Sequence, residues 1–358
     1  MYYLGIDVGS VSTDLVVMDE NRKILSQLYL KTRGNPIEAV KEGLRQLGSE
    51  YKSDEIAGAG ATGSGRTLAA AVIGADVVKN EITAHGVASA VFDPEIRTII
   101  EIGGQDSKII LLNDGVITDF AMNTVCAAGT GSFLDRQAER LGMEIGELGD
   151  YALRASNPVR IAGRCAVFAE SDIIHKQQLG CTMEDIIGGM SRALVRNYLS
   201  NVAKGKEILP KVCFQGGVAS NKGILRALEE ALGCEVVVPE YHKVMGAFGS
   251  AVLAQEYMEN TAGEAQANGK IPFRLKPGNF RMAPADICFA NGARCVKKTR
   301  FKGFEAGHDD ITTETFECAD CSNHCEVVIL RSGGRQIGCF SDRCGKYQTM
   351  KSEAGKAQ

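Results

Sequence analysis

The sequence predicts an α/β fold with two similar lobes and a C-terminal cysteine-rich extension. The chain of 358 residues is longer than one hydrophobic core usually organises. From Met1 to about Leu30 the pattern reads as strand, glycine-rich turn, strand, turn and strand, and the same order returns from Arg97 to Asn123. Beyond about Asn260 the sequence becomes polar and then rich in cysteine. These observations indicate a duplicated core followed by an appended module.

Further strand and helix patterns alternate along both lobes. We expect the first lobe over residues 1–95 plus 243–260, the second over 96–242, and a linker with a cysteine-rich module over 261–358. Pro36 near a first turn marks one helix start. Helices are predicted over Pro36–Leu47, 78–92, Gly131–Leu141, Ala166–Leu179, Met183–Ala203, 219–233 and 242–258, with strands over 211–217 and 235–239.

Composition excludes several classes of function. A net charge of −4 argues against a surface built to neutralise nucleic-acid phosphates, so we expect no nucleic-acid partner. The chain opens on an apolar strand pattern without an export signal, which predicts a cytoplasmic location. No apolar run approaches the roughly 20 residues needed to cross a bilayer, so no membrane partner is expected. Twelve cysteines in such a chain favour metal or cluster ligation for some of them and buried thiols for the rest.

The two repeated glycine turns are candidate phosphate sites. Each follows a strand and carries a carboxylate, Asp7 in the first and Asp106 in the second. Backbone N–H groups of a glycine turn can wrap phosphate oxygens, and the carboxylate can hold the accompanying magnesium. Either turn alone would equally fit an ordinary hairpin with a solvated aspartate. The other candidate residues of these turns are Gly9, Ser10, Ser12, Thr13, Gly103, Gly104 and Gln105.

Two later segments extend the candidate nucleotide site. Gly216, Gly217 and Asn221 stand between a strand and a helix, where glycine permits close approach of a base and sugar. The small residues of Gly246–Ala251 predict a helix that lies close to another backbone, as in an interlobe hinge, or simply packs. Gly63–Arg66 predicts a loop at the cleft or at a subunit contact. Neither a P-loop nor a strand-linked GxGxxG motif with a downstream acid is present.

Cys126 and Cys165 are candidate iron–sulfur ligands. Each is predicted to stand immediately before a helix, whose exposed N–H groups favour a thiolate. Two cysteines cannot complete the four-thiolate shell of a [4Fe–4S] cluster, so a two-fold homodimer would supply two from each subunit. The alternative is that both are small buried residues.

The order of these motifs over about residues 1–260 resembles the superfamily of acetate and sugar kinases, heat-shock chaperones and actin, whose lobes are ribonuclease H-like. The segments NTVCAAGTGSFLD and GRCAVFAESDII, together with IGGQDSK and GGVASN, resemble the activator ATPases (component A) of 2-hydroxyacyl-CoA dehydratases. They are also similar to the ATP-binding subunits of benzoyl-CoA reductases, of the BadF/BadG/BcrA/BcrD type. The resemblance implies a homodimer that binds ATP and Mg²⁺ and holds one [4Fe–4S] cluster between its subunits.

That resemblance also implies a mechanism. ATP binding closes the cleft and swings the cysteine-bearing helices, and hydrolysis drives a low-potential electron to an iron–sulfur acceptor such as a dehydratase or a double-cubane cluster protein. A ferredoxin or flavodoxin would act upstream. Asp7 and Asp106 would arrange magnesium, and Gln105 or Glu81 would orient water. His85 lies one helical turn after Glu81, and we expect it to face solvent.

The C-terminal module carries a second candidate metal site. Its ligands would be Cys318, Cys321, Cys325, Cys339 and Cys344, binding zinc or a second iron–sulfur cluster. Cys288 and Cys295 could join them, and His324 is expected to be solvated. We expect Cys181, Cys213 and Cys234 to be buried thiols.

This module departs from the compact activators, which end near residue 260, and leaves the electron acceptor open. Two other functions stay open for the whole chain. One is a small-molecule kinase of the same superfamily. The other is a nucleotide-sensing protein without redox work.

Overall fold

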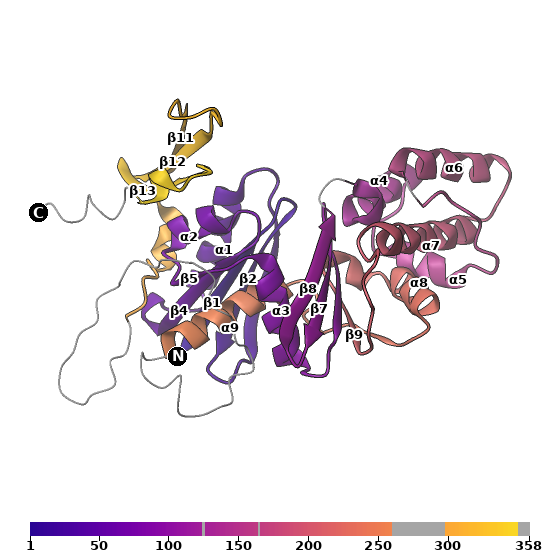
Figure 1. Ribbon diagram of the computed structural model, residues 1–358, viewed down its shortest axis with the longest axis horizontal. Coiled ribbons are helices and arrows are strands. Elements are labelled where there is room, and N and C mark those ends of the chain that lie inside the picture. Colours follow the sequence, from indigo (N-terminus) through magenta and orange to yellow (C-terminus); the bar gives the residue numbers. More distant parts are fainter. Residues whose placement is uncertain (124–125, 164, 260–297, 350–358) are drawn as a thin grey trace, which may run out of the picture. The chain divides into compact units, whose positions relative to one another are not determined.

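Two units, each with its own five-stranded sheet and hydrophobic core, make up the described chain (Figure 1). The computed structural model describes residues 1–123, 126–163, 165–259 and 298–349. The first unit contains residues 1–84 and the chain from 246 onward, and the second contains residues 85–245. The predicted start of the linker, Cys288 and Cys295 lie outside the described residues. No helix in the described ranges is both long and apolar enough to span a bilayer.

The first sheet has the strand order β3-β2-β1-β4-β5. Its first three strands form an antiparallel meander, and β4 and β5 continue in parallel with β1. Strands β1 and β2 are almost entirely buried, and the predicted glycine-rich turn joins them. Their bounds are β1 Tyr2–Val8, β2 Ser12–Asp19, β3 Ile24–Lys31, β4 Ile56–Thr62 and β5 Val77–Val78.

The second sheet, β8-β7-β6-β9-β10, repeats this order and these strand directions. The fold class predicted from the repeated glycine turns is therefore confirmed: the chain is an α/β protein with a duplicated sheet-containing lobe. The strand bounds are β6 Thr98–Ile102, β7 Ser107–Asn113, β8 Val116–Asn123, β9 Val212–Gln215 and β10 Val236–Val237.

Helices of the first unit pack closely on its sheet. Helix α1 begins at Pro36, where Asn35 accepts a hydrogen bond from the Glu38 N–H. Helix α9 crosses β1 and β4 at glycines: a Cβ on Gly5 would lie 1.9 Å from the Ala247 carbonyl oxygen. The small residues of α9 therefore serve packing against its own sheet. The helices are α1 Pro36–Gly48, α2 Arg66–Ile73, α9 Met245–Glu259 and α3 Glu81–Phe92, which begins here and continues into the second unit.

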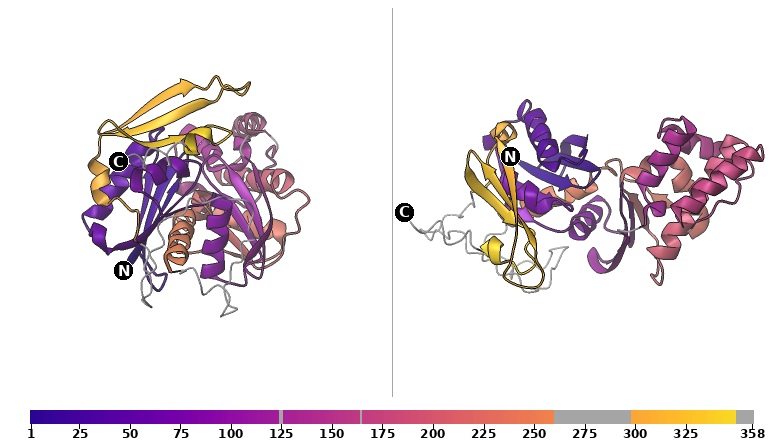
Figure 2. Two further views of the ribbon diagram at one scale, coloured as in Figure 1. Left: turned by 60° about the vertical axis from the view of Figure 1, so that its left-hand side comes forward. Right: turned by 90° about the horizontal axis from the view of Figure 1, so that it is seen from above.

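The second unit places its later helices together on one side of its sheet (Figure 2). They bury a core that includes Tyr198 and Phe214. Their bounds are α4 Gly131–Leu141, α5 Glu147–Arg154, α6 Ala166–Gln178, α7 Met183–Asn201 and α8 Lys222–Leu232, with 3₁₀ turns η2 at Ala127–Gly129 and η3 at Gly217–Ser220.

The C-terminal segment forms a three-stranded antiparallel sheet, β11 Ile311–Glu317, β12 Glu326–Ser332 and β13 Arg335–Phe340, followed by the short helix α10, Lys346–Thr349. The segment is fastened to the first unit before the sheet begins. The buried Asp76 carboxylate accepts hydrogen bonds from the Arg300 N–H at 2.8 Å and the Thr299 hydroxyl at 2.7 Å. Phe304 is buried in the core of the first unit and lies against Gly48.

Candidate functional site

The first glycine hairpin joins β1 to β2 and is held by hydrogen bonds of its backbone and of two threonine hydroxyls. The Gly9 N–H donates to the Ser12 carbonyl at 2.8 Å, which closes the turn. The Thr32 hydroxyl donates to the Gly9 carbonyl and hydrogen bonds to the Thr13 hydroxyl, each at 3.0 Å. Thr13 is fully buried, so its side chain supports the turn, whereas Ser10 is exposed at the tip.

The loop Gly63–Arg66 is part of this hairpin's surroundings. The Gly65 N–H donates to the Val8 carbonyl at 2.8 Å, and a Cβ on Gly63 would lie 2.4 Å from an Asp7 carboxylate oxygen. Gly63 has φ +91°, a conformation that L side chains rarely adopt. This loop therefore borders the predicted magnesium carboxylate, and its glycine spacing was the only signal for it in the sequence.

The second hairpin, between β6 and β7, lies next to a buried cluster of charged side chains. Lys108 is 2% exposed, and its ammonium lies 2.9 Å from both the Glu101 and Asp106 carboxylates. Burial raises the pKa of Glu101, and the Lys108 charge opposes that rise. The turn is closed by the Gly103 N–H donating to the Asp106 carbonyl at 3.0 Å. Gln105 is exposed at the tip, available to a ligand.

The segment Gln215–Asn221 lies against this hairpin. A Cβ on Gly216 would lie 2.3 Å from the Ile102 carbonyl oxygen and 2.7 Å from a Glu101 carboxylate oxygen, so only glycine fits there. Gly216 has φ +90°. The Asn221 side chain caps α8 by accepting from the Ile224 N–H at 3.1 Å.

The expectation that His85 faces solvent is wrong. Its side chain is buried, and Nδ1 lies 2.8 Å from the Gln215 amide oxygen. Gln215 also donates to the Ser89 hydroxyl one turn further along α3. His85 and Ser89 therefore hold the strand end that precedes Gly216. The partner is 130 residues away in the sequence, which local helix spacing could not reveal. Glu81, at the start of the same helix, is half-buried.

Cys126 and Cys165 lie on two loops, and both loops contact the Asn197 side chain of α7. Asn197 is 1% exposed and donates to the Gly163 carbonyl at 2.7 Å, two residues before Cys165. A Cβ on Gly129, three residues after Cys126, would meet the Asn197 amide oxygen at 2.8 Å. Both thiols are partly exposed. Sequence reasoning missed Asn197, because nothing in its helical context marks a contact with two loops.

Cys126 and Cys165 were both predicted to stand immediately before a helix, and this prediction is wrong for Cys126. Cys165 directly precedes α6, as expected. Cys126 instead precedes the 3₁₀ turn η2, and α4 begins five residues later at Gly131. Asn123 causes this turn by accepting from the Cys126 N–H at 3.0 Å and donating to its carbonyl at 2.8 Å.

The second hairpin is directly bonded to the start of α4. The Gly131 and Ser132 N–H groups donate to the Gly103 and Gly104 carbonyls, each at 2.8 Å. The Ser132 hydroxyl adds a hydrogen bond to the Gly104 carbonyl at 2.5 Å. The candidate phosphate turn and the Cys126 loop are therefore separated by one short, hydrogen-bonded stretch of backbone.

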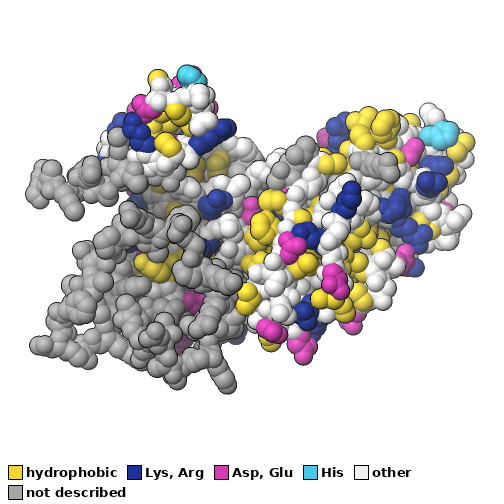
Figure 3. Space-filling view, viewed as in Figure 1, with side chains coloured by type: hydrophobic (Ala, Val, Ile, Leu, Met, Phe, Trp, Pro, Cys, Tyr) yellow, Lys and Arg dark blue, Asp and Glu magenta, His cyan; other side chains and the backbone are white. Residues whose placement is uncertain are grey.

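An exposed apolar surface adjoins Cys165. Val167 and Phe168, the second and third residues after Cys165, are 68% and 67% exposed. Figure 3 shows apolar side chains gathered on the surface over α4 and α6. Arg140 joins these helices through an ion pair to Glu170 at 2.5 Å.

The C-terminal cysteines are only partly brought together. Cys318, Cys325 and Cys339 contribute to one small apolar cluster, whereas Cys321 and Cys344 are exposed. Across the described ranges, no three His, Cys, Asp or Glu side chains are grouped closely enough to hold a metal ion. His324 is exposed, as predicted, and lies 2.8 Å from Glu317.

Of the three cysteines expected to be buried thiols, only Cys213 is buried, and its burial raises the pKa of the thiol to about 12. Cys181 and Cys234 are partly exposed, so the prediction is wrong for them. Both follow helix ends closed by a glycine, Gly180 and Gly233, where the chain turns at the surface.

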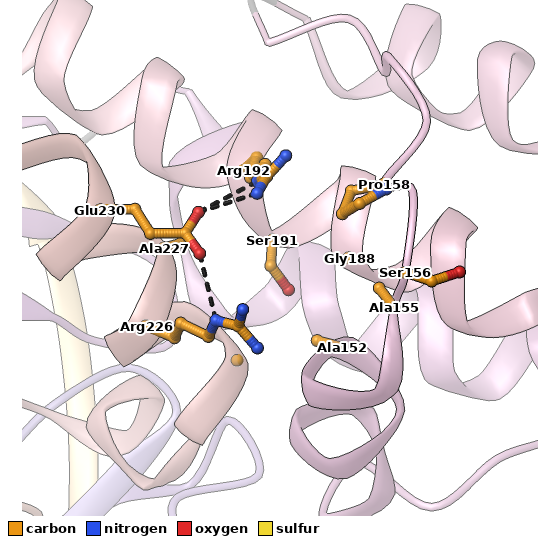
Figure 4. Close-up of a pocket in the computed structure, with 11 residues that line it drawn as sticks. Ala152, Ala155, Ser156, Pro158, Gly188, Ser191, Arg192, Arg226, Ala227 and Glu230 are labelled. Carbon is orange, nitrogen blue, oxygen red and sulfur yellow. Dashed lines mark hydrogen bonds and ion pairs between the residues drawn. The ribbon is translucent and has the colours of Figure 1, made fainter.

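A small cavity of about 110 Å³ lies between α5, α7 and α8 of the second unit (Figure 4). The Glu230 carboxylate at its edge pairs with Arg192 at 2.9 Å and with Arg226 at 3.1 Å. Both carboxylate oxygens of Glu230 are therefore engaged by guanidinium groups at the edge of this cavity.

Comparison with known proteins identifies the family. The sequence profile of the BadF/BadG/BcrA/BcrD ATPase family matches residues 4–254. The chain is 34% identical to the (R)-2-hydroxyglutaryl-CoA dehydratase activating ATPase of Acidaminococcus fermentans, over 71% of this chain and 97% of that protein. It is 33% identical to the 2-hydroxyisocaproyl-CoA dehydratase activator of Clostridioides difficile, over 71% and 95%.

Solved structures agree with these relatives. The Acidaminococcus fermentans dehydratase component A superposes with a TM-score of 0.66 at 33% identity, covering 72% of this chain and 98% of that one. The Clostridium difficile activator with bound ADPNP gives 0.65 at 32% identity, covering 72% and 95%. Because the profile and both relatives span the duplicated lobes, the resemblance drawn from the motifs is confirmed, and the chain belongs to the BadF/BadG/BcrA/BcrD ATPase family.

Proposed function

We propose that this protein is an ATP-dependent activator that passes an electron from a [4Fe–4S] cluster, shared between two copies of the chain, to an iron–sulfur acceptor enzyme. The family membership and an ADPNP-bound relative support ATP as the ligand. Relatives named as dehydratase activators support an acceptor enzyme as the partner. A ferredoxin or flavodoxin would be the upstream reductant.

The nucleotide is proposed to bind the two glycine hairpins. Backbone N–H groups of each turn would face phosphate oxygens, and Asp7 and Asp106 would hold Mg²⁺. Lys108 holds the Asp106 carboxylate in place through its 2.9 Å ion pair. Gln105 at the exposed tip, or Glu81 at the start of α3, would orient the attacking water.

Cys126 and Cys165 fit the role of cluster ligands. Both thiols are partly exposed, and the loops that carry them both contact Asn197. When bound, a cluster supplies a one-electron redox centre. The exposed pair Val167 and Phe168 beside Cys165 supports a homodimer, because a second copy would cover apolar surface next to the shared ligands.

One observation carries the coupling between ATP and the cluster. Gly131 and Ser132 bond α4 to the second hairpin, and the Cys126 loop immediately precedes them. A change in the hairpin when the γ-phosphate is lost would therefore shift the cysteine loop through backbone hydrogen bonds. A sugar or small-molecule kinase would not need this connection, and Glu230 is paired with two arginines.

The test uses anaerobically purified protein. About four irons per two chains are expected, with none in a Cys126→Ala, Cys165→Ala double variant. The rate at which a chelator removes this iron should differ between ADP and a non-hydrolysable ATP analogue. Gly131→Ala should abolish this difference, because its Cβ would lie 3.0 Å from the Gly103 carbonyl.

Gly146→Ala is the matched control, since nothing lies within 4 Å of its added Cβ. Wild-type protein without iron would contradict the cluster. Iron release that ignores the nucleotide in wild type would contradict the coupling while leaving the cluster intact.

A further inference from the structure

The cysteines of the C-terminal sheet are not equivalent, because the strand register divides them into two places. Strands β11 and β12 pair Glu317 with Glu326, so the next pair along the ladder is Cys318 with Cys325. The Cys318 N–H confirms this pairing by donating to the Cys325 carbonyl at 2.9 Å. These two cysteines close the hairpin, and Cys321 lies in the loop between them.

Cys344 belongs to the same end of the sheet. Strand β13 pairs Phe340 with Val328 and runs antiparallel to β12, so the chain after Phe340 heads toward Cys325. Lys346 forms an ion pair with Asp320 in the hairpin loop, and the Tyr347 hydroxyl lies 3.6 Å from the Cys318 sulfur. The segment that carries Cys344 therefore returns to the hairpin loop.

Two further interactions hold the segment 342–347 near the hairpin loop. The buried Asp342 carboxylate accepts a hydrogen bond from the Tyr347 N–H at 2.8 Å. The Cys318 and Cys344 thiols both act electrostatically on the Lys346 ammonium. The Lys346 side chain is therefore near the sulfur atoms of both segments.

Cys339 shares an apolar cluster with Cys318 and Cys325 but lies further along the sheet. It pairs with Ile329, four residues along β12 from Cys325, which corresponds to about 13 Å at the usual rise of a strand. Its side chain is buried in the apolar cluster. This position fits a packing residue, so we leave Cys339 out of the site at the hairpin end.

We propose that Cys318, Cys321, Cys325 and Cys344 form a four-thiolate site for one zinc ion. The spacing of Cys318 and Cys321 is that of a zinc-binding turn. Opposed residues in a ladder have Cβ atoms about 5 Å apart, which suits sulfur ligands about 3.8 Å apart around one tetrahedral ion. An iron–sulfur cluster would need its ligands further apart.

Binding would gather the four thiols, which are not grouped around one point in the part of the chain that the structure describes. The exposed Cys321 and Cys344 would turn inward from their loops toward Cys318 and Cys325. Zinc would then cross-link the hairpin to the segment after β13, and its binding energy would stabilise the small sheet.

The test counts metals in the full chain carrying Cys126→Ala and Cys165→Ala, so that iron of the proposed bridging cluster does not interfere. After anaerobic purification from zinc-supplemented medium, about one zinc per chain and no iron are expected. Cys321→Ser and Cys344→Ser should each lower the zinc content at least about tenfold. Both residues are exposed, so these substitutions leave the metal-free fold unchanged.

Cys339→Ala is the matched control and should keep its zinc. Replacement of zinc by cobalt should give the intense sulfur-to-metal absorption of a tetrahedral thiolate site in this control and in the parent, but not in Cys344→Ser. Absence of zinc from the parent, iron with sulfide in its place, or equal loss of zinc in Cys339→Ala would each overturn the proposal.

Discussion

The two glycine hairpins occupy the same position in sheets of the same strand order, yet different chemistry holds them. The first is supported by the hydroxyls of Thr13 and Thr32. The second stands on the buried ions Glu101 and Lys108 and is bonded to the start of α4. Duplication of a fold therefore conserved the backbone turn while the surroundings diverged. Only the charged hairpin is connected to a cysteine loop among the residues that the structure describes.

Removal of the buried charge should separate the hairpins most strongly. Lys108→Met leaves the Glu101 carboxylate buried without its cation, at a cost of about 3–5 kcal/mol in the free energy of unfolding. Urea unfolding measures this loss. Glu101→Gln added to Lys108→Met should recover much of the stability, since no uncompensated buried charge remains. A double variant as unstable as the single one would show that the ion pair is not the cause.

The same variant has a predictable pH dependence. Burial holds the pKa of Glu101 above its usual value of 4.5, and loss of Lys108 removes the charge that opposes this rise. A raised pKa means that the folded state binds the proton more tightly, so stability is present at low pH and falls as pH rises through the folded pKa. Lys108→Met should therefore be closer to wild type near about pH 5 than at about pH 7. Equal destabilisation at both values would contradict the assignment.

At the first hairpin, steric crowding rather than charge should limit substitution. Gly63→Ala would place a Cβ 2.4 Å from Asp7 and should weaken ATP binding about tenfold or more, measured by calorimetry. Gly34→Ala is the control, because Gly34 also has positive φ, +72°, but has nothing within 4 Å. We expect Gly34→Ala to cost about 1 kcal/mol of stability and no ATP affinity. Equal effects on affinity would show that backbone strain alone is responsible.

The smallest effect is expected at the hydroxyls under the first hairpin. Thr13→Val removes one neutral hydrogen bond and should cost about 0.5–1.5 kcal/mol in urea unfolding. Thr32→Val should cost more, because the Gly9 carbonyl also loses its donor. If either cost approached that of Lys108→Met, the contrast between a neutral and a charged hairpin would be wrong.

Local patterns in the sequence were sufficient for most of the fold. The helix predicted over Gly131–Leu141 has those bounds in the structure, since Gly142 in a left-handed conformation ends it. The repeated strand and turn pattern located both sheets. By contrast, the burial of His85 depends on Gln215, and the pairing of the cysteine loops depends on Asn197. These contacts join residues from distant elements, so no periodicity or spacing records them.

The hydrogen bonds from the C-terminal segment to Asp76 predict that a shortened chain is less stable. The family profile ends at residue 254, which invites removal of everything beyond it. The buried Asp76 carboxylate would then lose the Thr299 and Arg300 donors. The apolar side chains that pack against Phe304 would become exposed to water. A trimmed protein should thus be prone to aggregate on the face that the tail now covers. The segment from Thr299 to Phe304 is therefore part of the packing of the first unit and not a separable domain.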